Sequence, residues 1–255
     1  MTLPRVSFLM ATNKCDDYAR IALVSCLGQT FTDFELVLVA NGMSDSEYEA
    51  LEKLCSSDLR IHLFRTDIAR ITFSLNFGLH HCRGALVARM DADDVSYPDR
   101  LARQVAFMDS NPDISICGSF CDVVDKEQNI VGDWKYPTTD RAIRLGMFWK
   151  NPLCHPSVIY RRKVIVDAGG YSGFFAEDYA LWAFSSENKT IKFANIPERL
   201  LGYRADAADH PRTSRKRKSK ASVAGTQYQC FAATGDVRWL FAALLSFAKI
   251  IFYAR

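Results

Sequence analysis

The alternation of short apolar runs with amphipathic segments over the first 94 residues constrains the fold of this chain more than any other feature. Each apolar run is rich in strand-forming residues and stops at a polar or glycine-containing turn, and the following segment has apolar residues at helical spacing. Such repeats with short connections predict a parallel, doubly wound α/β sheet. The predicted strands are residues 6–11, 34–40, 61–64 and 85–90, and the predicted helices are residues 18–27, 47–55 and 73–82.

The second half of the chain is less regular but continues the mixed α/β pattern. Its predicted helices are residues 100–108, 141–149 and 178–185, and its predicted strands are residues 114–124, 157–160 and 191–194. Composition changes after Arg204, because residues 212–220 contain six basic side chains and no acidic one, and residues 238–255 are overwhelmingly apolar. We therefore expect one domain over residues 1–205, followed by a basic linker and an apolar helix over residues 206–255.

The composition excludes several classes of protein. With 255 residues, 49% hydrophobic side chains and a formal charge of +3, the chain resembles a globular protein and not a disordered or collagen-like one. The small charge gives no argument for nucleic-acid binding, and no signal-peptide pattern precedes the first predicted strand. Its eight cysteines are too sparse for a disulfide scaffold, and Cys117 and Cys121 lack zinc-knuckle spacing. We expect eight free thiols in a reducing cytoplasm.

A dense acidic cluster follows the predicted strand at residues 85–90. Asp91, Asp93 and Asp94 lie within four residues, and carboxylates so close together repel one another unless a cation joins them. Mg²⁺ and Mn²⁺ prefer oxygen ligands and often share them with phosphates. Ligands of doubly wound sheets bind beyond the carboxyl ends of the strands, where this cluster falls. The pattern favours a metal–diphosphate site over a solvated acidic turn.

Three further polar positions each have a functional and a structural interpretation. Asn41 is either a contact to a nucleotide base or part of an ordinary Asn-Gly turn, and local chemistry favours the turn. Glu177 and Asp178 leave a loop rich in glycine and aromatic residues, where a carboxylate can act as a general base, although acids also stabilise a helix N-terminus. Local chemistry does not decide between these two roles for Glu177 and Asp178. For the lone His155 it favours a structural role.

The order and spacing of these segments resemble those of the family 2 glycosyltransferases of GT-A fold over about residues 5–204. The resemblance implies an α/β fold with a Rossmann-like, mostly parallel central sheet flanked by helices, here with a C-terminal helical tail. It also implies a nucleotide-binding half at about residues 1–110 and an acceptor-binding half at about residues 111–205. The segments that carry it are VSFLMATNK, QTFTDFELVLVANGMSD, SLNFGLHHCRG, ARMDADDVSYPDRL, NPLCHPSVIYRR, GGYSGFFAEDYALW and IPERLLGYR.

The resemblance implies roles for the acidic residues. Asp91-Ala92-Asp93 matches the DXD motif, with Asp93 as the principal ligand of Mn²⁺ or Mg²⁺ against the donor diphosphate and Asp91 on the ribose or in the metal shell. Asp178 matches the catalytic base that deprotonates the acceptor hydroxyl, and Glu177 orients that base or holds the acceptor. The remaining matches are Ala11, Thr12, Asn41 and Ala92 in the nucleotide pocket, and His155, Tyr171 and Trp182 on the donor-sugar or acceptor side.

The chain departs from the family pattern at three points. Members often have Pro-x-Tyr-Asn after the first strand, where this chain has ATNK, and Asp-Asp-Gly-Ser after the second, where it has ANGM. The amide oxygen of Asn41 can still accept the uracil N–H, so uridine recognition stays the expectation. Members often have a histidine two residues after the position of Arg204. This chain has Asp206 there, and its nearest histidine is His210.

The expected reaction is the metal-dependent transfer of a hexose or N-acetylhexosamine from a UDP-sugar to a growing surface glycan, such as an O-antigen, a capsule or a lipooligosaccharide. One base and no enzyme nucleophile predict a single displacement with inversion, which gives a β-glycoside from an α-linked donor. Two alternatives stay open. A sugar nucleotidyltransferase needs a phosphate loop, for which residues 11–17 offer only Lys14. The other is a nucleotide-sugar-binding protein without catalysis.

The C-terminal tail adds a prediction about the membrane. Residues 239–254 are apolar except for Ser246 and Lys249, and they are fewer than the roughly 20 residues of a membrane-spanning helix. With the basic run before them, they favour an interfacial anchor on the inner face of the cytoplasmic membrane, where a lipid-linked acceptor would lie. The alternative is a helix docked on the protein or on a dimer partner. The basic run has no aromatic RNA-binding motif beside it, so we expect no nucleic-acid partner.

Overall fold

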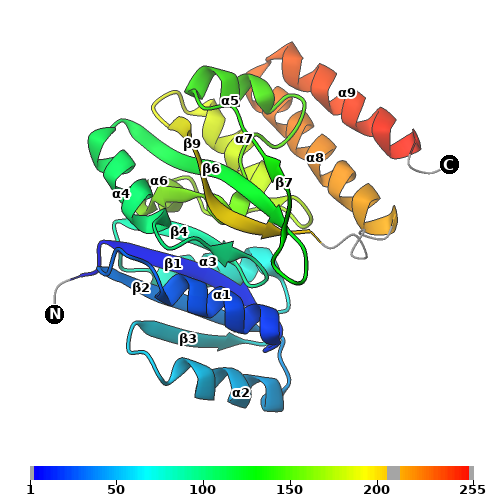
Figure 1. Cartoon of the computed structure of the whole chain (residues 1–255). Coiled ribbons are helices and arrows are strands. Elements are labelled where there is room, and N and C mark those ends of the chain that lie inside the picture. Colours follow the sequence, from blue (N-terminus) through cyan, green and yellow to red (C-terminus); the bar gives the residue numbers. More distant parts are fainter. Residues whose placement is uncertain (1–2, 206–212, 253–255) are drawn as a thin grey trace.

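A mixed β-sheet runs through the centre of the molecule, and helices cover both of its faces (Figure 1). The computed structural model describes residues 3–205 and 213–252. The strands are β1 (Val6–Thr12), β2 (Phe34–Asn41), β3 (Ile61–Thr66), β4 (Leu86–Asp91), β5 (Val95–Ser96), β6 (Ile114–Val124), β7 (Ile130–Trp134), β8 (Ile159–Arg161) and β9 (Lys192–Arg204). The helices are α1 (Asp17–Leu27), α2 (Asp45–Cys55), α3 (Ile71–His81), α4 (Arg100–Ser110), α5 (Asp140–Gly146), α6 (Arg162–Asp167), α7 (Glu177–Glu187), α8 (Thr213–Thr234) and α9 (Val237–Phe252).

Parallel pairing in the N-terminal half brings the carboxyl ends of several strands to one edge of the sheet. The strand order is β3-β2-β1-β4-β8-β6-β9-β5, with β7 paired to β6, and β3, β2, β1 and β4 run parallel. In the register, Ala11 of β1 lies opposite Asp91 of β4, and Thr12 lies opposite Ala40 of β2. This register therefore gathers polar residues that are far apart in the sequence.

The side chains of the central strands feed two hydrophobic cores, one on each face of the sheet. Phe8 of β1 belongs to the core shared with α1, α2 and α4, whereas its neighbour Leu9 belongs to the core shared with α3, α5 and α7. Because β1 is buried on both faces, it reads as a continuous apolar run, as parallel strands do. Full burial of one such side chain stabilises the fold by about 1.5–3 kcal/mol. Gly78 lets α3 approach the sheet closely because it has no side chain. A Cβ at this position would lie 2.4 Å from Cδ1 of Leu9.

The second half of the sheet differs from the prediction in its lengths and partners. β9 has 13 residues where four were predicted, because the exposed segment at residues 197–199 interrupts its apolar pattern without ending the strand. β8 is short, since His155–Ser157 forms a 3₁₀ turn before it. The strands β5 and β7 and the helix α6 were not predicted. All five residues of β7 are exposed, so no burial pattern marks it in the sequence.

The C-terminal region forms two packed helices rather than a linker and one helix. The part of the basic run from Thr213 onward begins α8, which packs on α7, and α9 packs along α8 (Figure 1). Among the described residues, no helix is both long and apolar enough to cross a membrane. The part of the predicted linker at residues 206–212 lies outside the described residues. All eight cysteines are free thiols, as expected.

The face of α9 that packs against the protein carries Trp239 together with small and polar residues. Ala242 and Ser246 are buried, and Oγ of Ser246 donates a 2.8 Å hydrogen bond to Oε1 of Gln227 in α8. Nε2 of Gln227 donates to the hydroxyl of Tyr179 in α7, which in turn donates to the carbonyl of Met147. The large apolar side chains on the opposite face stay exposed, namely Val237, Phe241, Leu244, Phe247 and Ile251.

Candidate active site

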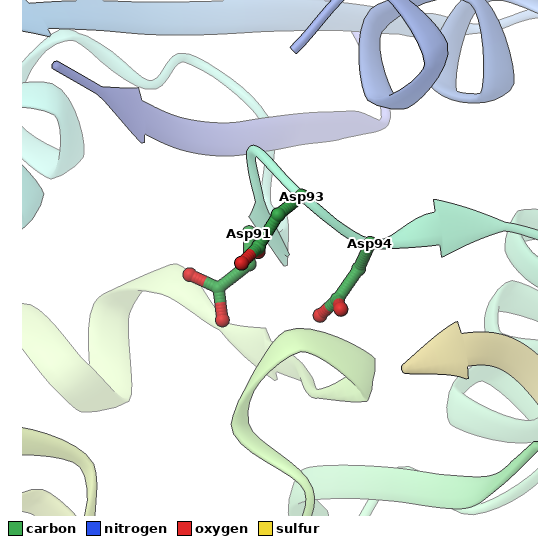
Figure 2. A group of neighbouring side chains, drawn as sticks. All are labelled: Asp91, Asp93 and Asp94. Carbon is green, nitrogen blue, oxygen red and sulfur yellow. The ribbon is translucent and has the colours of Figure 1, made fainter. Parts of the chain in front are cut away.

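The three aspartates predicted as a metal site leave one turn at the end of β4. Figure 2 shows the carboxyl groups of Asp91, Asp93 and Asp94 pointing to the same side of that turn. One carboxylate oxygen from each lies within 4.8 Å of the others. Asp94 is buried, and its Oδ2 has no hydrogen-bond partner among the described residues. The turn therefore concentrates negative charge and leaves an oxygen available.

The electrostatics of this turn fit a hard divalent cation. Desolvation and the neighbouring Asp91 carboxylate raise the pKa of Asp93 to about 6. Burial, with Asp91 and Asp93 beside it, raises the pKa of Asp94 well above its ordinary value. Both shifts mean that the surrounding protein supplies too little positive charge for three ionised carboxylates. An all-oxygen donor set of this kind suits Mg²⁺ or Mn²⁺.

Arg204, the last residue of β9, holds the acidic turn in place. Its backbone N–H donates a 2.8 Å hydrogen bond to Oδ1 of Asp94, and its Nε donates a 2.8 Å hydrogen bond to the carbonyl of Asp93. Its guanidinium also lies 4.2 Å from the ring centre of Tyr18. The loop that follows, with Asp206 and His210, lies outside the described residues.

The predicted nucleotide-pocket residues lie beside the acidic turn. Ala11 pairs with Asp91, and Asn41 ends the neighbouring strand β2. Asn41 does precede a turn, since Gly42 has a φ of 61°, which favours glycine. The Nδ2 of Asn41 donates to Oγ of Ser74 at 2.9 Å, so its amide oxygen is the group left for a ligand. The hydroxyl of Thr12 instead donates a local hydrogen bond to the carbonyl of Lys14.

Glu177 and Asp178, the two acids that include the predicted catalytic base, begin helix α7. Nδ2 of Asn151 donates a 2.5 Å hydrogen bond to Oδ2 of Asp178. Burial raises the pKa of Asp178, while the Tyr179 backbone N–H, the charge of Arg89 and the Asn151 amide act against that rise. Burial and the Asp178 charge raise the pKa of Glu177. Asp178 is therefore a partly buried carboxylate that neutral donors, the Asn151 amide and the Tyr179 backbone N–H, hold in position.

Arg89 is a buried cation between the two acidic groups, and the sequence analysis missed it. It is 2% exposed, and its Nη2 forms a 2.5 Å ion pair with Oδ1 of Asp91. Its Nε and Nη1 have no hydrogen-bond partner among the described residues. Its charge also counteracts the raised pKa of Glu177 and of Asp178. A charged residue inside an apolar strand, two positions before Asp91, was the signal in the sequence.

The aromatic residues predicted on the substrate side form a cluster in the protein interior. Nε2 of His155 lies 3.3 Å from the hydroxyl of Tyr171, and the ring centres of His155 and Trp182 are 5.9 Å apart. Burial, with the charge of Arg89, lowers the pKa of His155 well below its ordinary value, which keeps the ring neutral. Trp182 is 0% exposed, so it offers a substrate no surface and supports His155 from behind.

Comparison with known proteins identifies the family. The sequence pattern of the family described as Glycosyl transferase family 2 matches residues 7–169, which is more than half of the chain. The O-antigen biosynthesis glycosyltransferase WbnJ of Escherichia coli is 34% identical over 205 residues, covering 79% of this chain and 80% of WbnJ. The chain belongs to glycosyltransferase family 2. The family match ends before Glu177 and Asp178, so the role of these two acids stays a prediction.

A further relative agrees with this glycosyltransferase assignment, and two solved structures share the fold. A UDP-Gal:alpha-D-GlcNAc-diphosphoundecaprenol beta-1,3-galactosyltransferase of Escherichia coli is 29% identical over 189 residues, covering 72% of this chain and 69% of that protein. TarS of S. aureus in complex with UDP-GlcNAc has a TM-score of 0.64 at 17% identity, over 88% of this chain and 66% of TarS. The mannosyltransferase PcManGT of Pyrobaculum calidifontis, in complex with GDP-Man and Mn²⁺, has a TM-score of 0.65 at 14% identity. The match covers 97% of this chain and 75% of PcManGT. The predicted GT-A fold is confirmed.

Two hydrogen bonds fasten the glycine-rich loop of this family 2 enzyme to α3. Nδ2 of Asn76 donates to the carbonyl of Tyr171 at 2.9 Å, and the Tyr171 N–H donates to Oδ1 of Asn76 at 2.7 Å. The loop leads directly into α7 and Asp178. Asn76 was not predicted as a site residue, because its partner lies 95 positions away and no local pattern marks it.

A cavity of about 250 Å³ opens beside the predicted base of the glycosyltransferase. Asp178 lines it together with residues from the loop after α5 and from α8 and α9. The sequence analysis treated the C-terminal helices as separate from the catalytic domain. The structure makes them part of the wall next to Asp178.

Proposed function

We propose that this family 2 glycosyltransferase moves a hexose or an N-acetylhexosamine from a UDP-sugar to a hydroxyl of a growing, lipid-linked surface glycan, with inversion and a β-glycosidic product. The similarity to WbnJ supports a role in O-antigen or related polysaccharide synthesis. The galactosyltransferase relative acts on a sugar carried by diphosphoundecaprenol, which supports a lipid-linked acceptor.

The acidic turn after β4 is the proposed site for the donor diphosphate. Asp91, Asp93 and Asp94 would hold a divalent cation, since their oxygens converge and the Oδ2 of Asp94 is unengaged. Mn²⁺ or Mg²⁺, when bound there, supplies positive charge that favours departure of a diphosphate leaving group. The amide oxygen of Asn41 is the proposed acceptor for the uracil N–H. The UDP-GlcNAc complex of TarS supports a uridine donor, and the GDP-Man complex of PcManGT is the counter-example.

Asp178 is the proposed general base. Its partly buried carboxylate accepts from Asn151, which leaves the other oxygen to take the proton of an acceptor hydroxyl. The raised pKa of Asp178 makes it a stronger proton acceptor than an exposed aspartate. A hydroxyl deprotonated there attacks the anomeric carbon directly. With no enzyme nucleophile on the path, one displacement inverts the configuration.

One observation carries this proposal: the base and the acidic turn share an electrostatic environment. The charge of Asp91 contributes to the raised pKa of Glu177 and to that of Asp178. Arg89 forms an ion pair with Asp91 and counteracts the same two shifts. A group that accepts a proton therefore lies near the group that would face the diphosphate, as a direct transfer needs.

A donor screen tests the proposed reaction. Purified protein is mixed with UDP-, GDP- and dTDP-sugars, with Mn²⁺ or with EDTA, and the released nucleoside diphosphate is measured. We expect release from one UDP-sugar that EDTA abolishes. Release from a GDP- or dTDP-sugar would overturn the uridine assignment and keep the mechanism. If hydrolysis without an acceptor is too slow, calorimetry with the free nucleotides replaces it, and no binding of any nucleotide would contradict the proposed function.

The C-terminal helices support a peripheral membrane location at the cytoplasmic face. Residues 213–252 contain seven basic side chains and one acidic one, Asp236, which pairs with Arg238. The exposed apolar face of α9 lies on the same helical pair. An apolar face beside excess positive charge suits the interface of an anionic bilayer.

A further inference from the structure

The cavity beside Asp178 carries an excess of positive charge. Lys150 follows α5, Lys220 lies in α8, and Lys249 lies in α9, and all three line the cavity. Asp178 is its one acidic lining residue among those described. A cavity with three ammonium groups and one carboxylate attracts an anion.

Lys220 of α8 and Lys249 of α9 lie near each other on two adjacent helices, without a compensating acid. Among the described residues, no carboxylate lies within ion-pair distance of either ammonium. Burial and the nearby Lys249 charge lower the pKa of Lys220, as expected for a half-buried cation that lies close to a second, exposed cation. An anion that binds between the two ammonium groups offsets the repulsion between their positive charges.

The rim of the cavity is aromatic and continues onto the apolar face of α9. Trp149 and Phe175 line the cavity, and both are exposed, at 59% and 41%. The ring centres of Trp149 and Phe241 are 6.4 Å apart. Phe241 belongs to the exposed apolar face of α9. The path out of the cavity therefore leads from a carboxylate, past lysines, to an apolar surface.

We propose that Lys220 and Lys249 bind a phosphate or diphosphate that joins the acceptor sugar to its lipid chain. The acceptor sugar then occupies the cavity with its hydroxyl at Asp178, and the lipid chain leaves along α9. This assignment rests on the proposed function and adds the residues that recognise the acceptor. Lys220 is half-buried and Lys249 is exposed at the edge of the cavity, and ammonium groups bind phosphate oxygens by charge-assisted hydrogen bonds.

Direct binding of inorganic pyrophosphate tests the lysine pair. Calorimetry is carried out in EDTA, so that no divalent cation links the probe to Asp91 and Asp93. We expect Lys220→Gln and Lys249→Gln each to weaken binding about tenfold, since a hydrogen bond to a charged group has that value or more. Lys53→Gln, an exposed lysine on α2 at the opposite end of the molecule (Figure 1), should change nothing.

Acceptor kinetics test the same pair in the reaction. One acceptor is an N-acetylhexosamine joined through a diphosphate to a short alkyl chain, and the other is the same sugar joined directly to that chain. The Lys220→Gln/Lys249→Gln variant should raise KM for the first acceptor about tenfold or more with little change in kcat. Its KM for the second acceptor should equal that of the unmodified protein.

The outcomes separate this inference from the proposed function. Equal pyrophosphate affinity in the double variant and the unmodified protein, or no affinity in either, would overturn the lysine assignment. Loss of binding to phosphatidylglycerol vesicles with unchanged pyrophosphate affinity would also overturn it, because the lysines would then serve lipid headgroups. UDP binding with Mn²⁺ is measured on every variant. It reports on folding and the donor site, so its loss would count against the proposed function instead.

Discussion

Nδ2 of Asn151 donates a 2.5 Å hydrogen bond to Oδ2 of Asp178 and joins the loop after α5 to the first turn of α7. Burial raises the pKa of Asp178, and this bond acts against the rise because it stabilises the ionised carboxylate. A base works only when it is deprotonated. The low-pH limb of the rate profile therefore depends on the balance between burial and the groups that oppose it, which are the Tyr179 backbone N–H, the charge of Arg89 and this donor.

Replacing Asn151 with alanine should move that limb to higher pH. Without the donor the pKa of Asp178 rises further, and the limb should shift by about one pH unit, the value of one lost hydrogen bond. Transfer rates measured from pH 5 to pH 9 check this, with Asn188→Ala at the other end of α7 as the control. A loss of rate that is equal at every pH would show that Asn151 acts on something other than protonation.

Asp178→Asn should abolish most transfer and leave donor binding intact. The amide keeps the shape of the side chain but cannot take a proton, so we expect a loss of about 10²–10⁴-fold in kcat. UDP affinity with Mn²⁺ should stay within about twofold because no donor contact changes. Glu177→Gln should have a smaller effect on kcat. If Asp178→Asn instead lost UDP, this residue would belong to the donor site.

Asp93→Ala should weaken UDP binding in Mn²⁺ and not in EDTA. One of three converging carboxylates is removed, and we expect at least a tenfold loss of metal-dependent affinity. Calorimetry of UDP in both buffers measures the difference directly. Glu52→Gln, an exposed carboxylate on α2, is the matched control. A variant with the same affinity as the unmodified protein in Mn²⁺ would contradict the metal assignment.

Glu35→Gln should destabilise the protein at neutral pH. Burial alone would raise the pKa of Glu35, but hydrogen bonds from Ser7 and Arg83 hold it below its ordinary value. A lowered folded-state pKa contributes stability above the unfolded-state pKa, and that stability is lost as the pH falls through the folded-state pKa. The expected loss in unfolding free energy is about 1–3 kcal/mol at pH 7.

Urea unfolding followed by circular dichroism at pH 7 and at pH 3 measures this effect. The difference between Glu35→Gln and the unmodified protein should shrink at the lower pH, because the stability from a lowered folded-state pKa is lost as the pH falls toward and through that pKa. Glu49→Gln, on the exposed face of α2, should stay within about 0.5 kcal/mol throughout. A difference that is the same at both pH values would mean that packing, and not charge, accounts for the loss.

Leu244→Glu/Phe247→Glu should prevent binding to anionic vesicles. These side chains are 59% and 50% exposed on α9, so the variant should fold normally while losing apolar contacts with lipid. We expect at least a tenfold loss in vesicle cosedimentation, since each contact of this size is worth about 1.5–3 kcal/mol. Leu59→Glu, at a leucine 96% exposed and distant from α9, is the control. Equal sedimentation of all three proteins would refute a role for α9 at the bilayer.

The N-terminal half of the fold could be predicted because its central strands, β1, β2 and β4, are buried on both faces. The apolar run of β2 has all eight residues buried, and polar residues stop it at both ends. β7 could not be predicted in this way, because its exposed residues are held by pairing to β6 and not by a core. The length of β9 depends on the register with β6, which no local window contains.

The candidate site divides along the same line. Asp91 and Asp93 could be found because several carboxylates stand together just after a strand. Asn76 and Asn151 could not, since each bonds to a partner remote in the sequence. Arg89 was not predicted although its partner Asp91 lies only two positions away. Trp182 packs behind His155 with none of its surface exposed, and its predicted place on the substrate side stays a prediction.

The hydrogen-bonded series from Ser246 through Gln227 and Tyr179 to Met147 sets a limit on shortening the chain. Gln227 is 2% exposed, and Ser246 is the donor that its amide oxygen accepts from. A protein that ends before α9 would leave that oxygen without its donor. It would also lose Trp239 and expose the side of the Phe148 ring on which Trp239 packs. The helix that carries Asp178 therefore has its support at the far C-terminal end. Activity and solubility in recombinant work should be judged on the full chain, because residues 3–205 alone lack this support.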